Sequence, residues 1–257
     1  MERVNEPRQV GLARALSKLG FCSRSQAAKL IRAGRVRLNG TPRRDPETPV
    51  RLERDRIEVD RHAVTAESKI YLMLNKPRGV VTTASDEKGR ETVYSLLGEK
   101  LTWVGPVGRL DKASEGLLLL TNDSEWAARI SDPGSHLDKT YHVQVGILPS
   151  MFITDTLRSG VRSGGELLRA RQARVLRGGE KNAWLEIVLD EGKNRQIRRM
   201  LEHLGIEVLR LIRVAIGPLA LGQLAKGESR ALATTEKSAL DQAVKISRDK
   251  SRILERE

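Results

Sequence analysis

Cysteine is almost absent from this chain, with Cys22 the only one among 257 residues. An intrachain disulfide is therefore excluded, and a reducing compartment such as the cytoplasm is the expected location. Long apolar runs are also lacking, because no stretch approaches the ~20 residues that a membrane-spanning helix requires. The first residues, Met1 to Pro7, contain no apolar segment typical of a signal peptide. These absences predict a cytoplasmic protein that does not enter a membrane.

Histidine is scarce as well, with four in the chain, and none of them stands in a metal-ligand spacing. With a single cysteine, a structural zinc site is not expected. Glycine-rich phosphate loops of the Walker or dinucleotide type are missing, and Ser114 lacks the motif of a nucleophile elbow. The sequence therefore predicts no metal and no nucleotide cofactor, and it disfavours a serine or cysteine hydrolase.

Aromatic residues make up 3% of the chain, whereas basic residues are abundant and the net charge is +13. Such a balance points first to nucleic acid, because neutralising phosphates releases counterions. Membrane-surface binding would favour aromatic anchors, which this composition does not supply. Residues 1–64 hold 15 Lys and Arg against 8 Asp and Glu, so the excess gathers near the N-terminus. A binding face is expected there, with a merely solvated basic face as the alternative.

Residues 9–64 are predicted to form a compact basic module of two helices and a hairpin. Apolar residues recur at helical spacing over 12–19, and a second, serine-capped helix is expected over 23–34. The Asn-Gly pair that closes the segment 36–40 is typical of a hairpin turn. The segment 19–40, LGFCSRSQAAKLIRAGRVRLNG, resembles the S4-type RNA-binding domain. The resemblance implies that the second helix and the following loop contact RNA backbone; their basic residues are Arg24, Lys29, Arg32 and Arg35.

Residues 69–235 are expected to form a second, larger domain. Apolar or alternating runs predict strands over 70–74, 117–120, 139–145 and 184–189, with helices over 124–130 and 195–204. Strands dominate and helices are scattered among them, so the fold class is α+β with a mixed, mainly antiparallel sheet. A polar linker is expected over 61–68. A surface helix of mixed charge is expected over the tail, 236–257.

The segment 108–123, GRLDKASEGLLLLTND, is the part of the sequence that says most about function. Asp111 precedes an apolar run that reads as a short buried strand, so its carboxylate is expected in a loop at the mouth of that strand. A glycosidase needs two carboxylates that face each other across the sugar. Asp123 would lie at the opposite end of the strand from Asp111. An acid at the position of Glu115 is more often solvated or salt-bridged than catalytic. Asp111 is therefore predicted to act alone rather than as half of a glycosidase pair.

Two distant segments offer partners for Asp111, and each has an alternative interpretation. The helix expected over 195–204 and the turn before it carry a basic cluster, made of Lys193, Arg195, Arg198 and Arg199. A guanidinium from this cluster could hold the carboxylate ionised, or the cluster could bind phosphate, and the residues alone do not separate the two. Tyr141, expected mid-strand, could pack in a core or stack on a nucleic-acid base.

Taken together, these segments resemble the RsuA/RluB/RluE/RluF family of ribosomal RNA pseudouridine synthases. The matching motifs are 108–123, Lys139-Thr140-Tyr141, EGKNRQIRRML at 191–201 and LRLIRVAIGPL at 209–219. The S4-type module fits the same family, and the resemblance extends over residues 9–235. It implies an enzyme that isomerises a uridine of ribosomal RNA to pseudouridine without a metal or cofactor. A monomer is expected.

The resemblance also implies the roles of the site residues. Asp111 would be the nucleophile that attacks the target uridine at the ribose anomeric carbon, after which the uracil detaches, turns and rejoins through carbon. Arg198 would pair with Asp111 and hold it ionised. Tyr141 would stack on the flipped base and assist proton removal. Arg109 would help to hold the extruded nucleotide or its phosphate.

Residues 79–96 look closer to the RluB-like branch, which implies 23S large-subunit RNA as the substrate. A 16S small-subunit target is the alternative. A catalytically silent RNA-binding assembly factor is a second class of function, which only an activity assay separates from an enzyme. A DNA-binding regulator would need a dimer and a recognition helix, and the large strand-rich second domain disfavours it.

Overall fold

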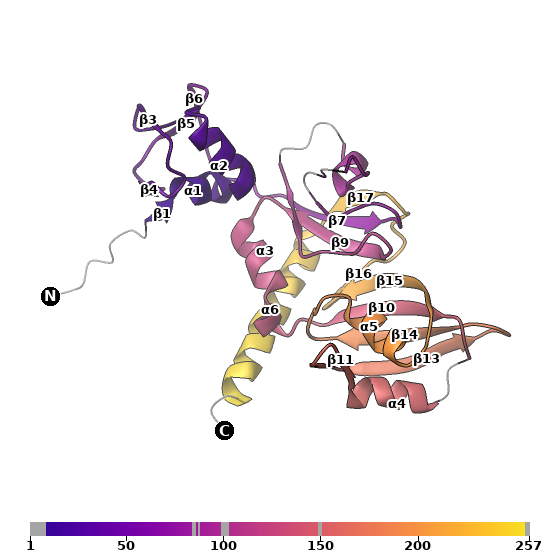
Figure 1. Ribbon diagram of the computed structural model, residues 1–257. Helices are drawn as coiled ribbons and strands as arrows, with labels where there is room; N and C mark the ends of the chain where they lie inside the picture. The colour runs from indigo at the N-terminus through magenta and orange to yellow at the C-terminus, as the bar shows by residue number, and fades with distance from the viewer. Residues whose placement is uncertain (1–8, 84–85, 87, 99–102, 149–150, 255–257) are drawn as a thin grey trace. The chain divides into compact units, whose positions relative to one another are not determined.

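The computed structural model describes residues 9–83, 86, 88–98, 103–148 and 151–254, with backbone alone for 151 and 247–254 (Figure 1). The chain divides into two compact units. The first comprises Met1–Tyr71, Glu99–Gly105 and Leu120–Trp126, and the second comprises the rest. Neither unit is continuous along the sequence. The domain boundaries expected from the sequence stay a prediction.

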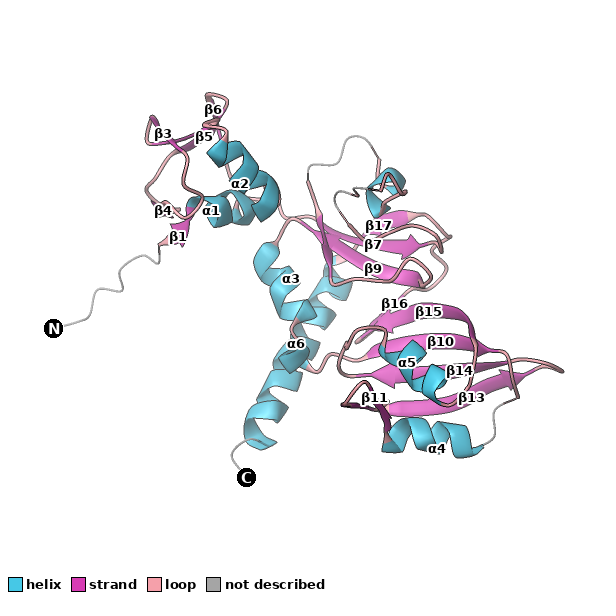
Figure 2. Cartoon of the chain, viewed as in Figure 1, coloured by secondary structure: helices cyan, strands magenta, loops and turns pink. Residues whose placement is uncertain are grey.

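Two helices pack on short antiparallel strands in the first unit (Figure 2). The helices are α1 (Leu12–Lys18) and α2 (Arg24–Arg32). The strands are β1 (Val10–Gly11), β2 (Val36–Leu38), β3 (Thr41–Arg43), β4 (Pro49–Val50), β5 (Ile57–Val59) and β6 (His62–Ala63). One sheet has the order β3-β2-β5-β6, and β1 pairs with β4. Apolar side chains of both helices and of β2, β4 and β5 form the core of this unit.

Local sequence signals account for most of this unit. Ser23 accepts a hydrogen bond from the backbone N–H of Gln26 and caps the start of α2, as the sequence predicted. The Gln26 side chain accepts in return from the backbone N–H of Ser23, which completes a capping box. Asn39 and Gly40 both have positive φ, 51° and 79°, which a two-residue hairpin of type I′ requires. The linker expected over 61–68 is wrong at its start, because β6 pairs with β5. Strand pairing there overrides the polar character of the segment.

A polar clamp fixes the chain just after this module. Asn122 is fully buried; its amide oxygen accepts from the backbone N–H of Ile70 (2.9 Å) and its amide nitrogen donates to the carbonyl of Ser68 (2.9 Å). Thr121 Oγ1 donates to the carbonyl of Ile70 (2.6 Å). The next residue, Asp123, caps α3 (Ser124–Ser131) through the backbone N–H of Trp126. The polar turn after the apolar run thus holds a neighbouring segment and starts a helix.

A nine-stranded mixed, mainly antiparallel sheet forms the centre of the second unit, with the main strand order β13-β14-β10-β15-β9-β7-β17. Its strands are β7 (Tyr71–Lys76), β8 (Gly105–Val107), β9 (Glu115–Thr121), β10 (Lys139–Val145), β13 (Gln172–Gly178), β14 (Ala183–Leu189), β15 (Val208–Ile216), β16 (Leu219–Ala220) and β17 (Ser229–Ala231). β9 and β15 pair in parallel. The predicted α+β class with a mixed sheet is confirmed.

Helices α4 (Met151–Ser159) and α5 (Gln196–His203) lie on the sheet made by β10, β13, β14 and β15 (Figure 1). Leu157 of α4 and three side chains of α5, Ile197, Met200 and Leu201, are buried in one core with that sheet. Their helical spacing in the sequence predicts an inward face made of Ile197, Met200, Leu201 and Leu204, and Leu204 packs against the same core. A short hairpin, β11 (Val161–Ser163) with β12 (Glu166–Leu168), completes this region.

The tail expected as a surface helix over 236–257 forms α6 (Thr234–Leu254), and its last residues, 255–257, lie outside the described residues. It packs against β16 and the 3₁₀ turn η2 (Pro133–Ser135), and it buries Leu240 and Val244. A second 3₁₀ turn, η1 (Val93–Leu96), follows a cap at Thr92. Across the described residues, no helix combines the length and apolar character needed to cross a membrane.

Candidate active site

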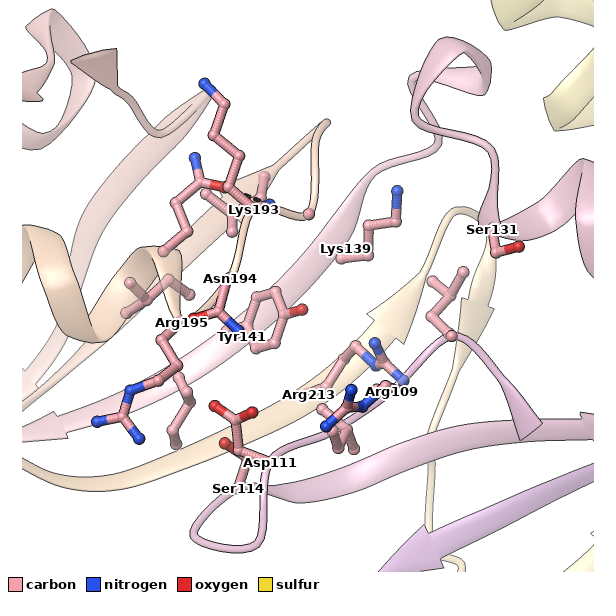
Figure 3. Close-up of a pocket in the computed structure, with 18 of the residues that line it drawn as sticks. Arg109, Asp111, Ser114, Ser131, Lys139, Tyr141, Lys193, Asn194, Arg195 and Arg213 are labelled. Carbon is pink, nitrogen blue, oxygen red and sulfur yellow. Dashed lines mark hydrogen bonds between the residues drawn. The ribbon is translucent and has the colours of Figure 1, made fainter. Parts of the chain in front are cut away.

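A cavity of about 420 Å³ opens in the second unit, beside the loop that precedes β9 (Figure 3). Five residues that the sequence predicted for the site line it, namely Arg109, Asp111, Tyr141, Lys193 and Arg195. They come from the loop before β9, from β10 and from the turn that leads into α5. The fold therefore gathers three distant motifs around one cavity.

The loop of Asp111 is held through its backbone: the carbonyls of five successive residues, 110–114, each accept a hydrogen bond from another segment of the chain. Thr82 Oγ1 donates to Leu110 (2.8 Å), Lys76 Nζ to Asp111 (3.2 Å) and Ser114 (2.9 Å), the backbone N–H of Gly79 to Lys112 (2.8 Å), and Arg198 Nη2 to Ala113 (3.1 Å). Such anchoring fixes the loop without using the carboxylate of Asp111, which lies half-buried at the cavity.

Lys76 is a residue of this site that the sequence did not predict. It ends β7, is fully buried, and its ammonium donates to three carbonyls, those of Pro77 (3.0 Å), Asp111 and Ser114. Burial lowers the pKa of Lys76 to about 8, against the opposing effect of the nearby Glu115 and Asp111 carboxylates. A lysine directly after an apolar strand was the available signal, since a buried lysine needs a built set of acceptors.

We expect the free energy of unfolding to depend on pH through the protonation of Lys76. The unfolded chain keeps this proton up to about pH 10.5 and the folded protein loses it at about pH 8, so the unfolded state binds more protons in between. Folding therefore gains from this group as the pH rises through that window, by up to about 3 kcal/mol. Urea denaturation at pH 7.5 to 10.5 gives the free energy of unfolding of the wild type and of Lys76→Met. We expect the wild type to become more stable relative to the variant as the pH rises. A pH-independent difference would contradict a buried ammonium.

The side chain of Arg198 contacts the backbone of the Asp111 loop. It is half-buried, its Nη2 donates to the carbonyl of Ala113, and its Nε is buried with no hydrogen-bond partner among the described residues. Burial lowers the pKa of Arg198, Arg195 adds to the effect, and Asp111 opposes it. Arg198 thus lies within electrostatic reach of Asp111. A direct ion pair between the two stays a prediction.

Tyr141 lies between the core and the cavity. Its ring packs against the core beneath α5 and also lines the cavity. Figure 3 shows the ring on the cavity wall above Asp111, with its hydroxyl turned toward the side of Lys139. A rigid aromatic face on the wall of a cavity is suited to stacking on a base.

The remaining basic residues divide between the cavity and other partners. Lys193 pairs with Glu191 (3.1 Å), and Arg195 precedes α5 with a left-handed backbone (φ 48°). Arg199 does not line the cavity; it pairs with Glu166 (2.8 Å). The four basic residues predicted to contact RNA from the first unit are exposed; they are Arg24, Lys29, Arg32 and Arg35. Arg35 Nε donates to Asp60 (2.8 Å).

Glu115 is unavailable as a second catalytic acid. Its side chain is 3% exposed and pairs with Arg210 (3.0 Å) and Lys226 (2.7 Å). Burial alone would raise the pKa of Glu115, but the hydrogen bonds from these two cations outweigh it and lower that pKa. The salt-bridged alternative expected for this acid is confirmed.

Gly116 allows β9 and β15 to approach each other next to the Asp111 loop. Its φ is +101°, and a Cβ would lie 2.2 Å from the carbonyl oxygen of Arg213. We expect Gly116→Ala to lower the free energy of unfolding by about 3 kcal/mol or more, because both the backbone and the strand contact are strained. Urea denaturation measures this. Gly98→Ala is the control, because a Cβ there meets open space, and it should change the free energy of unfolding by less than about 0.5 kcal/mol. Equal effects of the two substitutions would contradict the close contact between Gly116 and Arg213.

Comparison with known proteins defines the class. A family model described as RNA pseudouridylate synthase matches residues 70–203, and one described as S4 domain matches residues 10–57. The chain therefore belongs to the family of RNA pseudouridine synthases, with an S4 domain at its N-terminus. The resemblance inferred from the motifs is confirmed, and RNA is the partner of this class of enzyme.

Individual relatives extend over nearly the whole chain. An uncharacterized RNA pseudouridine synthase of Aquifex aeolicus is 38% identical over 92% of this chain and 95% of its own length. The ribosomal large subunit pseudouridine synthase B of Bacillus subtilis is 35% identical over 88% of this chain and 93% of its own. A crystal structure of a pseudouridylate synthase, 30% identical, covers 90% of this chain and 99% of its own with a TM-score of 0.64.

Proposed function

We propose that this enzyme converts a specific uridine of large-subunit ribosomal RNA to pseudouridine, with Asp111 as the nucleophile. The observation that carries the mechanism is the anchoring of five successive carbonyls around Asp111, which presents one carboxylate at the cavity. A preorganised nucleophile needs this kind of support. The large-subunit target is favoured by the similarity to the Bacillus subtilis synthase.

The chemistry requires one nucleophile and balances without a co-reactant. The Asp111 carboxylate attacks C1′ of the uridine, and the bond from C1′ to N1 breaks with its electrons on the uracil. The uracil turns, and C5 forms a bond to C1′ as the ester to Asp111 breaks. The proton on C5 is then removed and N1 is protonated. Tyr141 would stack on the extruded base throughout, offsetting the few kcal/mol that extrusion costs.

The substrate assignment is tested with purified enzyme and unmodified transcripts of both ribosomal RNAs. Incubation followed by chemical mapping of pseudouridine at each position should show one new site in the large-subunit RNA and none in the small-subunit RNA. A site only in the small-subunit RNA would overturn the target. No site in either RNA, with binding intact, would favour a silent assembly factor.

A further inference from the structure

One wall of the cavity carries cations to which the mechanism gives no role. Lys139 and Arg213 line the cavity together with Arg109 and Asp111, and Figure 3 shows them on the wall away from Lys193 and Arg195. Both stand in motifs that the sequence singled out, at the start of β10 and within β15.

Arg213 is a buried guanidinium with a free end. It is 6% exposed, and its Nε donates to the carbonyl of Leu117 (2.7 Å), while its Nη2 is buried with no hydrogen-bond partner in the part of the chain that the structure describes. No carboxylate of the described residues forms an ion pair with it. A buried, incompletely paired guanidinium costs free energy, so its retention at a cavity wall points to a ligand that completes its bonds.

The backbone is shaped to present this side chain. β15 has an irregular register opposite Thr140 and Tyr141, where Ala215 and Arg213 are the successive partners and one residue is extra. Such a bulge redirects side chains. On the other side, Arg213 pairs with Gly116 of β9, where no side chain fits. Two neighbouring strands thus fix where the guanidinium lies.

Lys139 adds a second positive charge beside it. Burial lowers the pKa of Lys139, and the charge of Arg213 lowers it further. The carboxylates that oppose this already have partners, because Asp138 pairs with Arg171 (2.8 Å) and Asp190 lies 3.7 Å from His136. Two cations held near each other in a half-buried wall repel unless an anion lies between them.

We propose that Lys139 and Arg213 form a phosphate subsite, which grips a phosphodiester flanking the extruded uridine while Asp111 and Tyr141 engage its ribose and base. The proposal rests on the proposed function. A uracil carbonyl is a poorer ligand for this wall, since a neutral acceptor leaves two like charges uncompensated. A phosphodiester supplies both the charge and several acceptor oxygens, which match a guanidinium and an ammonium.

The test removes one phosphate charge at a time. An RNA hairpin containing the uridine mapped above is made with a neutral methylphosphonate at its 5′ or its 3′ phosphate. For the wild type, one of these replacements should lower kcat/KM by about 10-fold to 100-fold relative to the natural hairpin. The same comparison is made with Arg213→Gln and Lys139→Met. Each variant is its own reference, so a partial loss of folded protein cancels.

In both variants the penalty for the neutral phosphate should shrink to less than about 3-fold, because the partner of that charge has gone. Arg177→Gln, which removes an exposed cation of β13 that stacks on Trp184, should keep the full penalty. A wild type indifferent to both replacements, or an unchanged penalty in Arg213→Gln and Lys139→Met, would overturn the subsite. If the natural hairpin is converted normally, that result leaves the proposed function standing. If neither this hairpin nor the full-length transcript is converted, both the subsite and the proposed function are overturned.

Discussion

Asp111→Asn is expected to lower kcat for pseudouridine formation by more than about 1,000-fold, because an amide cannot supply the attacking oxygen. Single-turnover assays on the natural hairpin measure it. RNA affinity should change by less than about 3-fold, since the loop is held through carbonyls that the substitution leaves in place.

The matched control for this variant lies one residue away. Lys112 is exposed, and its carbonyl, rather than its side chain, holds the loop. Lys112→Gln should therefore keep kcat within about 3-fold of the wild type. An active Asp111→Asn, or an equal loss in both variants, would contradict the assignment of the nucleophile.

Lys76→Met is expected to lower kcat by about 100-fold or more, although Lys76 does not line the cavity. The ammonium connects three carbonyls around the nucleophile, and a displacement of that loop by about 1 Å is enough for such a loss. Rapid-quench measurements at saturating RNA separate this effect on kcat from any effect on KM. A positioning role predicts that kcat falls while KM stays within about 3-fold.

The stability of Lys76→Met distinguishes positioning from general unfolding. The Asp111 carbonyl keeps its hydrogen bond from the backbone N–H of Ser114 (2.9 Å) in this variant. The carbonyls of Pro77 and Ser114 lose the ammonium, at about 1–3 kcal/mol each, but the variant also removes a buried charge that costs about 3 kcal/mol near neutral pH. We therefore expect the free energy of unfolding to change by less than about 3 kcal/mol. Lys181→Met, at an exposed lysine of the same unit, should alter neither property. A loss of activity explained by a large loss of folded protein would contradict the positioning role.

Local signals in the sequence were sufficient for the elements that carry the site. The apolar run after Asp111 predicted a buried strand, and all seven residues of β9 are buried. The spacing of Ile197, Met200 and Leu201 predicted the inward face of α5. These patterns depend only on periodicity and burial, which neighbouring residues determine.

The partners of the loop could not be predicted, because they depend on contacts between distant strands. Lys76 meets carbonyls up to 38 residues away, and Arg198 meets one 85 residues away. The same holds for Arg213, whose placement depends on a bulge in β15 and on a glycine in β9. Charge patterns showed a basic cluster before and within α5, but not that Arg199 pairs with Glu166 while Arg198 turns to the loop. Which cation faces which partner is a property of the tertiary structure.

The most direct test of Asp111 as a nucleophile acting on ribosomal RNA is a pseudouridine map of both ribosomal RNAs from cells that lack this gene. We expect one large-subunit position to lose its pseudouridine in that strain. Wild-type protein and Lys112→Gln should restore it, and Asp111→Asn should not, at equal protein levels. An unchanged map in the deletion strain, or restoration by Asp111→Asn, would contradict the account.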